Sequence, residues 1–223
     1  MRHPFDLKLQ ELQQSILRMG SMVEQTVSNA VRALAEQDTV LARKVVEFDD
    51  SIDDAQEAIE QSCMHAIALQ APLAGDLRLI SAIVQIATDL ERMGDHATNI
   101  AEVALRVGHT PLIKPLVDIP KMAQMAQNML RQSLDSFVRR DTELAQRVGK
   151  MDDPVDEIYA ALFDELADYV MRCDDPARGQ QAINLLFVAR DLERIADHAS
   201  NVAERTIFAV TGTRVRFNKQ PST

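Results

Sequence analysis

Two nearly identical stretches of the sequence place carboxylates where they could bind a cation. They read DLERMGDHATNIAE (residues 89–102) and DLERIADHASNVAE (residues 191–204). Residues four apart on a helix share one face. The pairs at this spacing are Glu91 with Asp95, and Glu193 with Asp197. A packed core requires apolar residues of suitable size but no particular charged ones, so the repeated charges indicate chemistry on the polar face.

A second pair of carboxylates precedes each of these stretches. Asp49 and Asp53 are four apart in the first half of the chain, and Asp152 and Asp156 are four apart in the second half. Like charges at this spacing destabilise a helix by about 0.2–0.5 kcal/mol per pair, and a multivalent cation would convert the repulsion into binding. If the two helices of each half pack side by side, the four carboxylates can converge into one cluster.

The candidate metal ligands are the carboxylates and the two asparagines beside them: Asp49, Asp53, Glu91, Asp95, Asn99, Asp152, Asp156, Glu193, Asp197 and Asn201. Carboxylate and amide oxygens are hard ligands, which suit magnesium, manganese, calcium or iron ions rather than a thiolate zinc site. The alternative is a solvated helix face with ion pairs, in which Arg92 pairs with both Asp89 and Asp95, and the second repeat does the same.

Histidines follow the carboxylate rows but do not have the spacing of di-iron ligands. His96 and His198 come one residue after each row, so we expect them beside the row or at the surface rather than on a metal. Neither Glu91 nor Glu193 begins an ExxH motif, so the ferritin-like pattern is absent. A metal-dependent hydrolase or oxidoreductase that uses the carboxylate clusters is the alternative to a non-enzymatic role.

The elements that must position these residues are helices. The chain has 7 Gly, no Trp and 4% aromatic residues, a composition that favours helices over sheets. Apolar residues at helical spacing predict three helices in each half, at residues 5–36, 38–69 and 77–104, and then at 120–139, 141–172 and 177–210. Three prolines between residues 111 and 120 predict a linker between the halves.

The repeat predicts an all-α fold of two tandem antiparallel three-helix bundles. Further matches support it: VVEFDDSID resembles VGKMDDPVD, and QDTVLA resembles RDTELA. We expect the first repeat at residues 1–110, the second at residues 111–212 and a polar C-terminal tail at residues 213–223.

Charge and hydropathy narrow the classes of partner and the compartment. The net charge of −10 argues against nucleic acid or anionic lipid as the main partner. No apolar run is long enough to cross a bilayer, and the first residues lack the apolar core of a signal peptide. Cys63 and Cys173 lack CxxC spacing and are expected as free thiols in a reducing compartment. These features predict a cytoplasmic protein.

The motif APLAGDLR (residues 71–78), followed by the two DLER segments, resembles the PhoU family of phosphate-transport regulatory proteins. The resemblance covers nearly the whole chain. It implies a non-enzymatic regulator of phosphate uptake that represses the phosphate-starvation response. The expected partners are the ATPase of a phosphate-specific ABC transporter and a sensor histidine kinase, which would hold the protein at the membrane periphery. A homodimer is also expected.

The family resemblance also implies metal ions, or multinuclear iron clusters, bound through E(D)xxxD motifs. These motifs fall here on the eight carboxylates already named, with Asn99 and Asn201 beside them. Iron, manganese, magnesium and zinc are the expected metals. The second repeat departs from the family at Ala196, where the first repeat has Gly94. Because both residues are small, we expect the second site to be retained.

Overall fold

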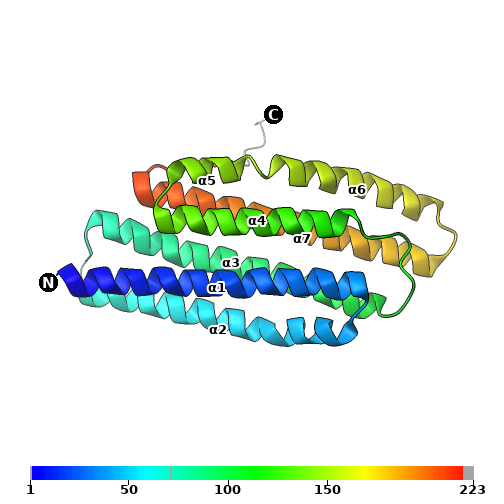
Figure 1. The fold of residues 1–223 in the computed structure, drawn as a ribbon, viewed down its shortest axis with the longest axis horizontal. Helices are drawn as coiled ribbons and strands as arrows, with labels where there is room; N and C mark the ends of the chain where they lie inside the picture. Colours follow the sequence, from blue (N-terminus) through cyan, green and yellow to red (C-terminus); the bar gives the residue numbers. More distant parts are fainter. Residues whose placement is uncertain (1, 71, 218–223) are drawn as a thin grey trace.

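The structure is a computed structural model that describes residues 2–70 and 72–217, and it is helical throughout its ordered elements (Figure 1). The first unit contains α1 (Arg2–Glu36), α2 (Thr39–Gln70) and α3 (Ala74–Val107). The second contains α4 (Asp118–Arg139), α5 (Thr142–Gly149), α6 (Asp153–Arg172) and α7 (Pro176–Thr211). The predicted all-α class is confirmed. Ala71 and the end of the predicted tail, 218–223, lie outside the described residues.

Equivalent residues end the first helix and begin the second in each unit. Gln37 and Arg140 both have φ of 54°, a left-handed conformation that terminates a helix. Asp38 and Asp141 follow, and each side chain accepts a hydrogen bond from a backbone N–H in the first turn of the next helix. The donors are Leu41 N and Leu144 N, each at 2.9 Å. The duplicated QD and RD pairs therefore produce the same turn twice.

The second helix of the second unit is divided, and the prediction of one helix at 141–172 is wrong. The chain leaves helical geometry after Gly149 and resumes it at Asp153. Pro154 stands at the first turn of α6, where its missing N–H costs nothing, but inside a longer helix its ring would clash with the preceding turn. The first repeat has Ser51 at the equivalent place, and α2 runs through it unbroken.

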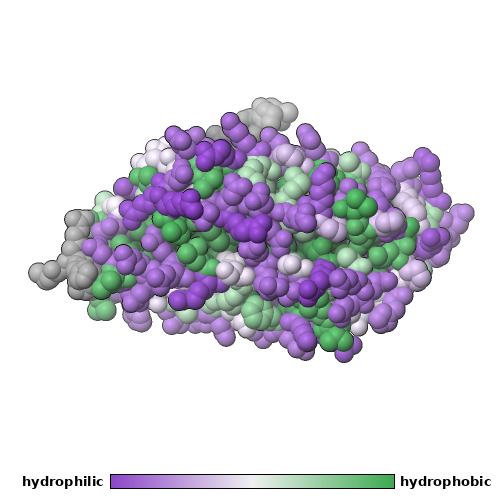
Figure 2. All heavy atoms as spheres, viewed as in Figure 1, coloured by the Kyte–Doolittle hydropathy of each residue, from purple (hydrophilic) through white to green (hydrophobic). Residues whose placement is uncertain are grey.

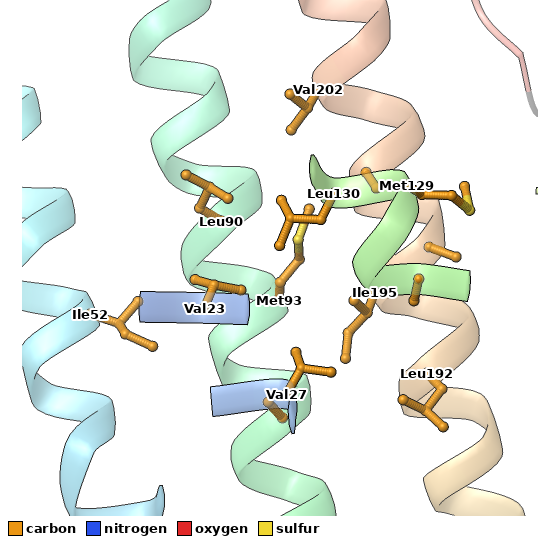
Figure 3. Close-up of a cluster of buried hydrophobic side chains, with 14 of the residues drawn as sticks. Val23, Val27, Ile52, Leu90, Met93, Met129, Leu130, Leu192, Ile195 and Val202 are labelled. Atoms are coloured by element: carbon orange, nitrogen blue, oxygen red, sulfur yellow. The ribbon is translucent and has the colours of Figure 1, made fainter. Parts of the chain in front are cut away.

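The two units pack together around one continuous hydrophobic core. In Figure 3, Val23 and Val27 of α1, Met93 of α3 and Ile195 of α7 converge between the units, and all four are buried. α3 of the first unit lies against α7 of the second, and α1 lies against α4 (Figure 1). A Cβ on Gly20 would overlap the tip of the Leu134 side chain, so the glycine leaves room for Leu134 in the α1–α4 contact. Full burial of each large apolar side chain stabilises the fold by about 1.5–3 kcal/mol.

Polar side chains cover most of the face shown in Figure 2, with apolar patches between them. Among the described residues, no helix combines the length and the apolar character needed to span a membrane. Cys63 and Cys173 are free, as expected.

Part of the predicted tail returns across the second unit. The Phe217 ring packs against Gly149, and the Phe217 N–H donates to Glu204 Oε1 at 2.7 Å.

Candidate functional site

The first carboxylate cluster forms where α2 and α3 pack closely. A Cβ on Gly94 would stand 3.0 Å from Ile52 Cδ1, so the absence of a side chain at Gly94 allows the two helices to approach. Asp49 of α2 and Glu91 of α3 are each partly buried beside this contact.

The carboxylates of this first cluster perturb one another's ionisation. The pKa of Glu91 is raised, chiefly by burial, then by the charge of Asp95, with smaller contributions from Asp53 and Asp49. The pKa of Asp49 is raised by burial too, and Asp95 and Asp53 add to the shift, while a hydrogen bond from Thr98 opposes it. The rows on α2 and α3 thus lie close enough to repel each other, which is the geometry expected from their spacing.

The second cluster repeats this arrangement where α6 begins beside α7. The pKa of Glu193 is raised to about 7, first by burial and next by Asp197, with Asp156 and Asp152 contributing. The pKa of Asp156 is raised by burial, then by Asp197 and Asp153. Asp152 is only 2% exposed. The break between α5 and α6 places these aspartates at the start of a helix rather than in the middle of one, which is the main difference from the first cluster.

Arginine side chains contact both clusters from the solvent side. Arg92 lies 3.4 Å from Glu91 and 3.3 Å from Asp95, and Arg194 lies 3.0 Å from Asp197. Of the two ion pairs predicted for each arginine as an ion-pair ladder, one is present: each arginine pairs with the aspartate that follows it. Both arginine side chains are more than half exposed, at 57% and 52%. Exposed pairs of this kind contribute about 0–1 kcal/mol, so they leave most of the repulsion within each cluster in place.

Asp89 and Asp191 take no part in that ladder, because they pair across the two units instead. His96 Nδ1 lies 2.9 Å from Asp191 Oδ1, and His198 Nδ1 lies 2.9 Å from Asp89 Oδ1. The two imidazole rings are 5.8 Å apart between centroids. Each histidine therefore contacts the aspartate of the other repeat. This reciprocal pairing at the α3–α7 interface is a physical reason why both the aspartate and the histidine occur in each repeat.

The two asparagines differ from each other in their surroundings. Asn201 donates through Nδ2 to Asp89 Oδ1 at 3.2 Å, so its side chain joins the pairing between the units. Asn99 is exposed on α3. Thr98, which sequence reasoning missed, donates to Asp49 Oδ1 at 3.0 Å and links α3 to α2. The only signal for it was the matching hydroxyl residue Ser200 in the second repeat.

The oxygen donors of each cluster are of the type that a hard cation prefers, but their present positions do not form a complete binding site. Each brings four carboxylates together, and repulsion and burial raise the pKa of some of them. A cation relieves both effects at once. In the described part of the chain, however, no group of three or more His, Cys, Asp or Glu side chains is arranged to hold a metal ion. Binding therefore requires side chains to rotate, including release of Asp95 from Arg92.

Neither His96 nor His198 is directed at a carboxylate cluster in the way that a metal-activated hydrolase would need. His96 and His198 face the opposite repeat, where each contacts an aspartate. The best-formed hollows in the described residues are lined by other side chains, with no carboxylate of either cluster among them. No observation of the site favours the alternative of a hydrolase or oxidoreductase.

Two repeated helical units, joined through α3 and α7 and each bearing a carboxylate cluster, define a duplicated helical-bundle protein. The family model for the PhoU domain matches the chain twice, at residues 16–104 and 119–206. The chain belongs to the PhoU family.

Named relatives match the chain over almost its whole length. A phosphate-specific transport system accessory protein PhoU homolog from Clostridium acetobutylicum is 40% identical over 97% of this chain and 99% of its own. A protein of the same name from Aquifex aeolicus is 44% identical over 94% of each chain. The crystal structure of PhoU from Pseudomonas aeruginosa matches with a TM-score of 0.88 and 37% identity, over 94% of this chain and 100% of that one.

Proposed function

We propose that this protein is a non-enzymatic accessory protein of a phosphate-specific transport system that regulates phosphate uptake. The observation that carries the proposal is the match to relatives so named, at about 40% identity and without large unmatched regions on either side. The crystal structure of PhoU from Pseudomonas aeruginosa supports it, because the likeness extends to the packing of both units.

The finer proposal is an adaptor at the cytoplasmic face of the membrane. It would link the ATPase of a phosphate ABC transporter to a sensor histidine kinase and keep the kinase inactive when phosphate is plentiful. Apolar side chains exposed on α6 and α7 support contact with other proteins. They include Phe163 at 46%, Met171 at 78% and Phe187 at 49% exposure. A homodimer would be one use of such surface.

Deletion of the gene tests the regulatory role. In phosphate-rich medium, cells without the gene are expected to express a phosphate-starvation reporter, and a wild-type copy is expected to silence it again. A reporter that stays silent in the deletion strain, with phosphate uptake unchanged, would reject negative regulation. The measurement does not depend on metal, so it tests this role separately from the carboxylate clusters.

We also propose that the two carboxylate clusters bind metal ions. Asp49, Asp53, Glu91 and Asp95 would hold the ions of the first unit, and the second unit would use its equivalents Asp152, Asp156, Glu193 and Asp197. Bound cations would neutralise these two carboxylate clusters and so change which charged partner surface can dock there.

Paired double variants test the metal assignment. Replacing Glu91 and Asp95 by Ala is expected to abolish metal in the first unit only, and the matched pair in the second unit is Glu193 with Asp197. Metal content is measured by elemental analysis of protein purified without chelator or metal-affinity resin. Each double variant should lose part of the metal and the combination all of it; metal content unchanged in both would reject the assignment.

A further inference from the structure

A cavity of about 200 Å³ lies at the start of α3, apart from both carboxylate clusters. Its walls come from the first turn of α3, the turn between α4 and α5, and the last part of α7. Both units therefore contribute to it. Arg78, which belongs to the APLAGDLR motif, and Arg140, which ends α4, line the same space. The metal sites proposed above give these two arginines no role.

Neither arginine has an acidic partner in the described part of the chain. No described carboxylate oxygen lies within 4.0 Å of either guanidinium. Nε of Arg78 is buried and makes no hydrogen bond to a described residue. The chain has 34 acidic residues against 24 basic ones, yet neither guanidinium group on this cavity has a described acidic partner. A buried donor without a partner costs about 1–3 kcal/mol unless a ligand or water accepts from it.

The Arg78 guanidinium lies beside the backbone of two glycines. A Cβ built on Gly212, which has φ of 76° at the end of α7, would lie 3.6 Å from Arg78 Nε. A Cβ built on Gly75 would lie 3.9 Å from the Nη2 atom. The guanidinium therefore lies between the start of α3 and the end of α7. Arg140 stands at the left-handed residue that ends α4, and it is exposed.

The start of α3 adds uncapped backbone donors beside the arginines. Leu73 precedes the helix and supplies no side-chain acceptor, and the first intrahelical bond is donated by Leu77 N to Leu73 O. The N–H groups of Ala74, Gly75 and Asp76 are left for another acceptor. Asp76 also lines the cavity, and among the described lining residues it is the one carboxylate that opposes an anion there.

We propose that this cavity binds a small tetrahedral oxyanion, of which inorganic phosphate is the representative. Two guanidinium groups match the oxygen pairs of a tetrahedral anion through parallel N–H donors. The volume is below that of pockets for drug-sized ligands, which selects a small free anion over a nucleotide. This inference goes beyond the proposed function, since an accessory protein can regulate transport without itself binding phosphate.

Calorimetric titration of the full chain with inorganic phosphate tests the site. The protein is first freed of metal with a chelator, so that phosphate cannot bind through a cation in the clusters, and chloride keeps the ionic strength constant. Arg78→Gln and Arg140→Gln are each expected to weaken phosphate binding about tenfold or more. Asp76→Asn removes the opposing charge and is expected to tighten binding.

Arg139→Gln is the matched control. Arg139 precedes Arg140, is exposed, and lies 3.8 Å from Asp135, so it loses the same charge without touching the cavity. Circular dichroism and the unfolding midpoint establish whether each variant is folded. If Arg78→Gln does not fold, Arg140→Gln still tests the site, because Arg140 is exposed and its replacement should not disturb the fold. The proposal is overturned if wild-type protein shows no saturable binding at millimolar phosphate. It is equally overturned if Arg139→Gln weakens binding as much as Arg140→Gln does.

Discussion

Replacing Glu193 by Gln is expected to stabilise the metal-free protein above neutral pH and to have a much smaller effect near pH 5. Burial, followed by the charge of Asp197, raises the pKa of Glu193 from 4.5 to about 7. The folded state therefore retains a proton that the unfolded chain releases. By linkage, this residue lowers the stability of the fold as pH rises from about 4.5 to about 7. Gln does not ionise, so the variant escapes that loss.

The size of the effect follows from the same pKa. At about 1.36 kcal/mol per pH unit, a rise from 4.5 to about 7 corresponds to about 3.4 kcal/mol as an upper limit. Glu193 is only partly buried, so water screens its repulsion, and we expect about 1–2 kcal/mol at pH 8. A cation in the second cluster would neutralise the repulsion, so adding manganese to metal-free protein should shrink the advantage of the variant.

Urea unfolding followed by circular dichroism at pH 5 and pH 8 measures this difference. The control is Glu157→Gln, which removes the same charge from an exposed position on α6. The reasoning is refuted if Glu193→Gln is no more stable than wild type at pH 8. It is also refuted if the gain is the same at both pH values, since helix propensity or net charge would then be the cause.

Two further predictions concern the contacts between helices, and both are measured by chemical unfolding. His96→Ala leaves the half-buried Asp191 without its partner and is expected to cost about 1–3 kcal/mol; a double variant with Asp191→Ala that costs the sum of the two single changes would show that the pair does not interact. Gly94→Val forces methyl groups against Ile52 and is expected to cost about 1–3 kcal/mol. Gly179→Ala meets no atom within 4 Å and is expected to be neutral or stabilising by up to about 1 kcal/mol, so equal losses in the two glycine variants would contradict the packing argument.

Local signals predicted the helices well because local chemistry decides where they begin and end. Asp38, the first residue of the helix predicted at 38–69, caps that helix with its side chain. Pro154 carried an equally local signal for the break between α5 and α6. The repeat with the first unit outweighed that signal, and there the residue at the same place is Ser51. Similarity between repeats thus misled where one proline differed.

Contacts between the two units could not be predicted, because helical spacing describes one helix at a time. Helical spacing predicted that Asp89 pairs with Arg92 on the same helix, yet Asp89 pairs with His198 of α7. Asn201 was predicted beside a metal, and in the structure its side chain also donates to Asp89. Only the packing of α3 against α7 reveals either contact.

The cavity at the start of α3 was beyond sequence reasoning as well. Arg78 was visible in the APLAGDLR motif, but its neighbour in space, Arg140, is far from it in the chain. The convergence of Asp49 and Asp53 with Glu91 and Asp95 was easier to anticipate, because α2 and α3 follow one another through a short turn.

Co-purification with the transporter tests the central claim, that this protein serves a phosphate-specific transport system, most directly. Tagged full-length protein is incubated with membranes from cells that contain the transporter and with membranes from cells that lack its genes. Captured proteins are identified by mass spectrometry. The account predicts that the transporter ATPase is captured from the first membranes, and that the second membranes yield none. Failure to capture any transporter component from membranes that contain it would contradict the account.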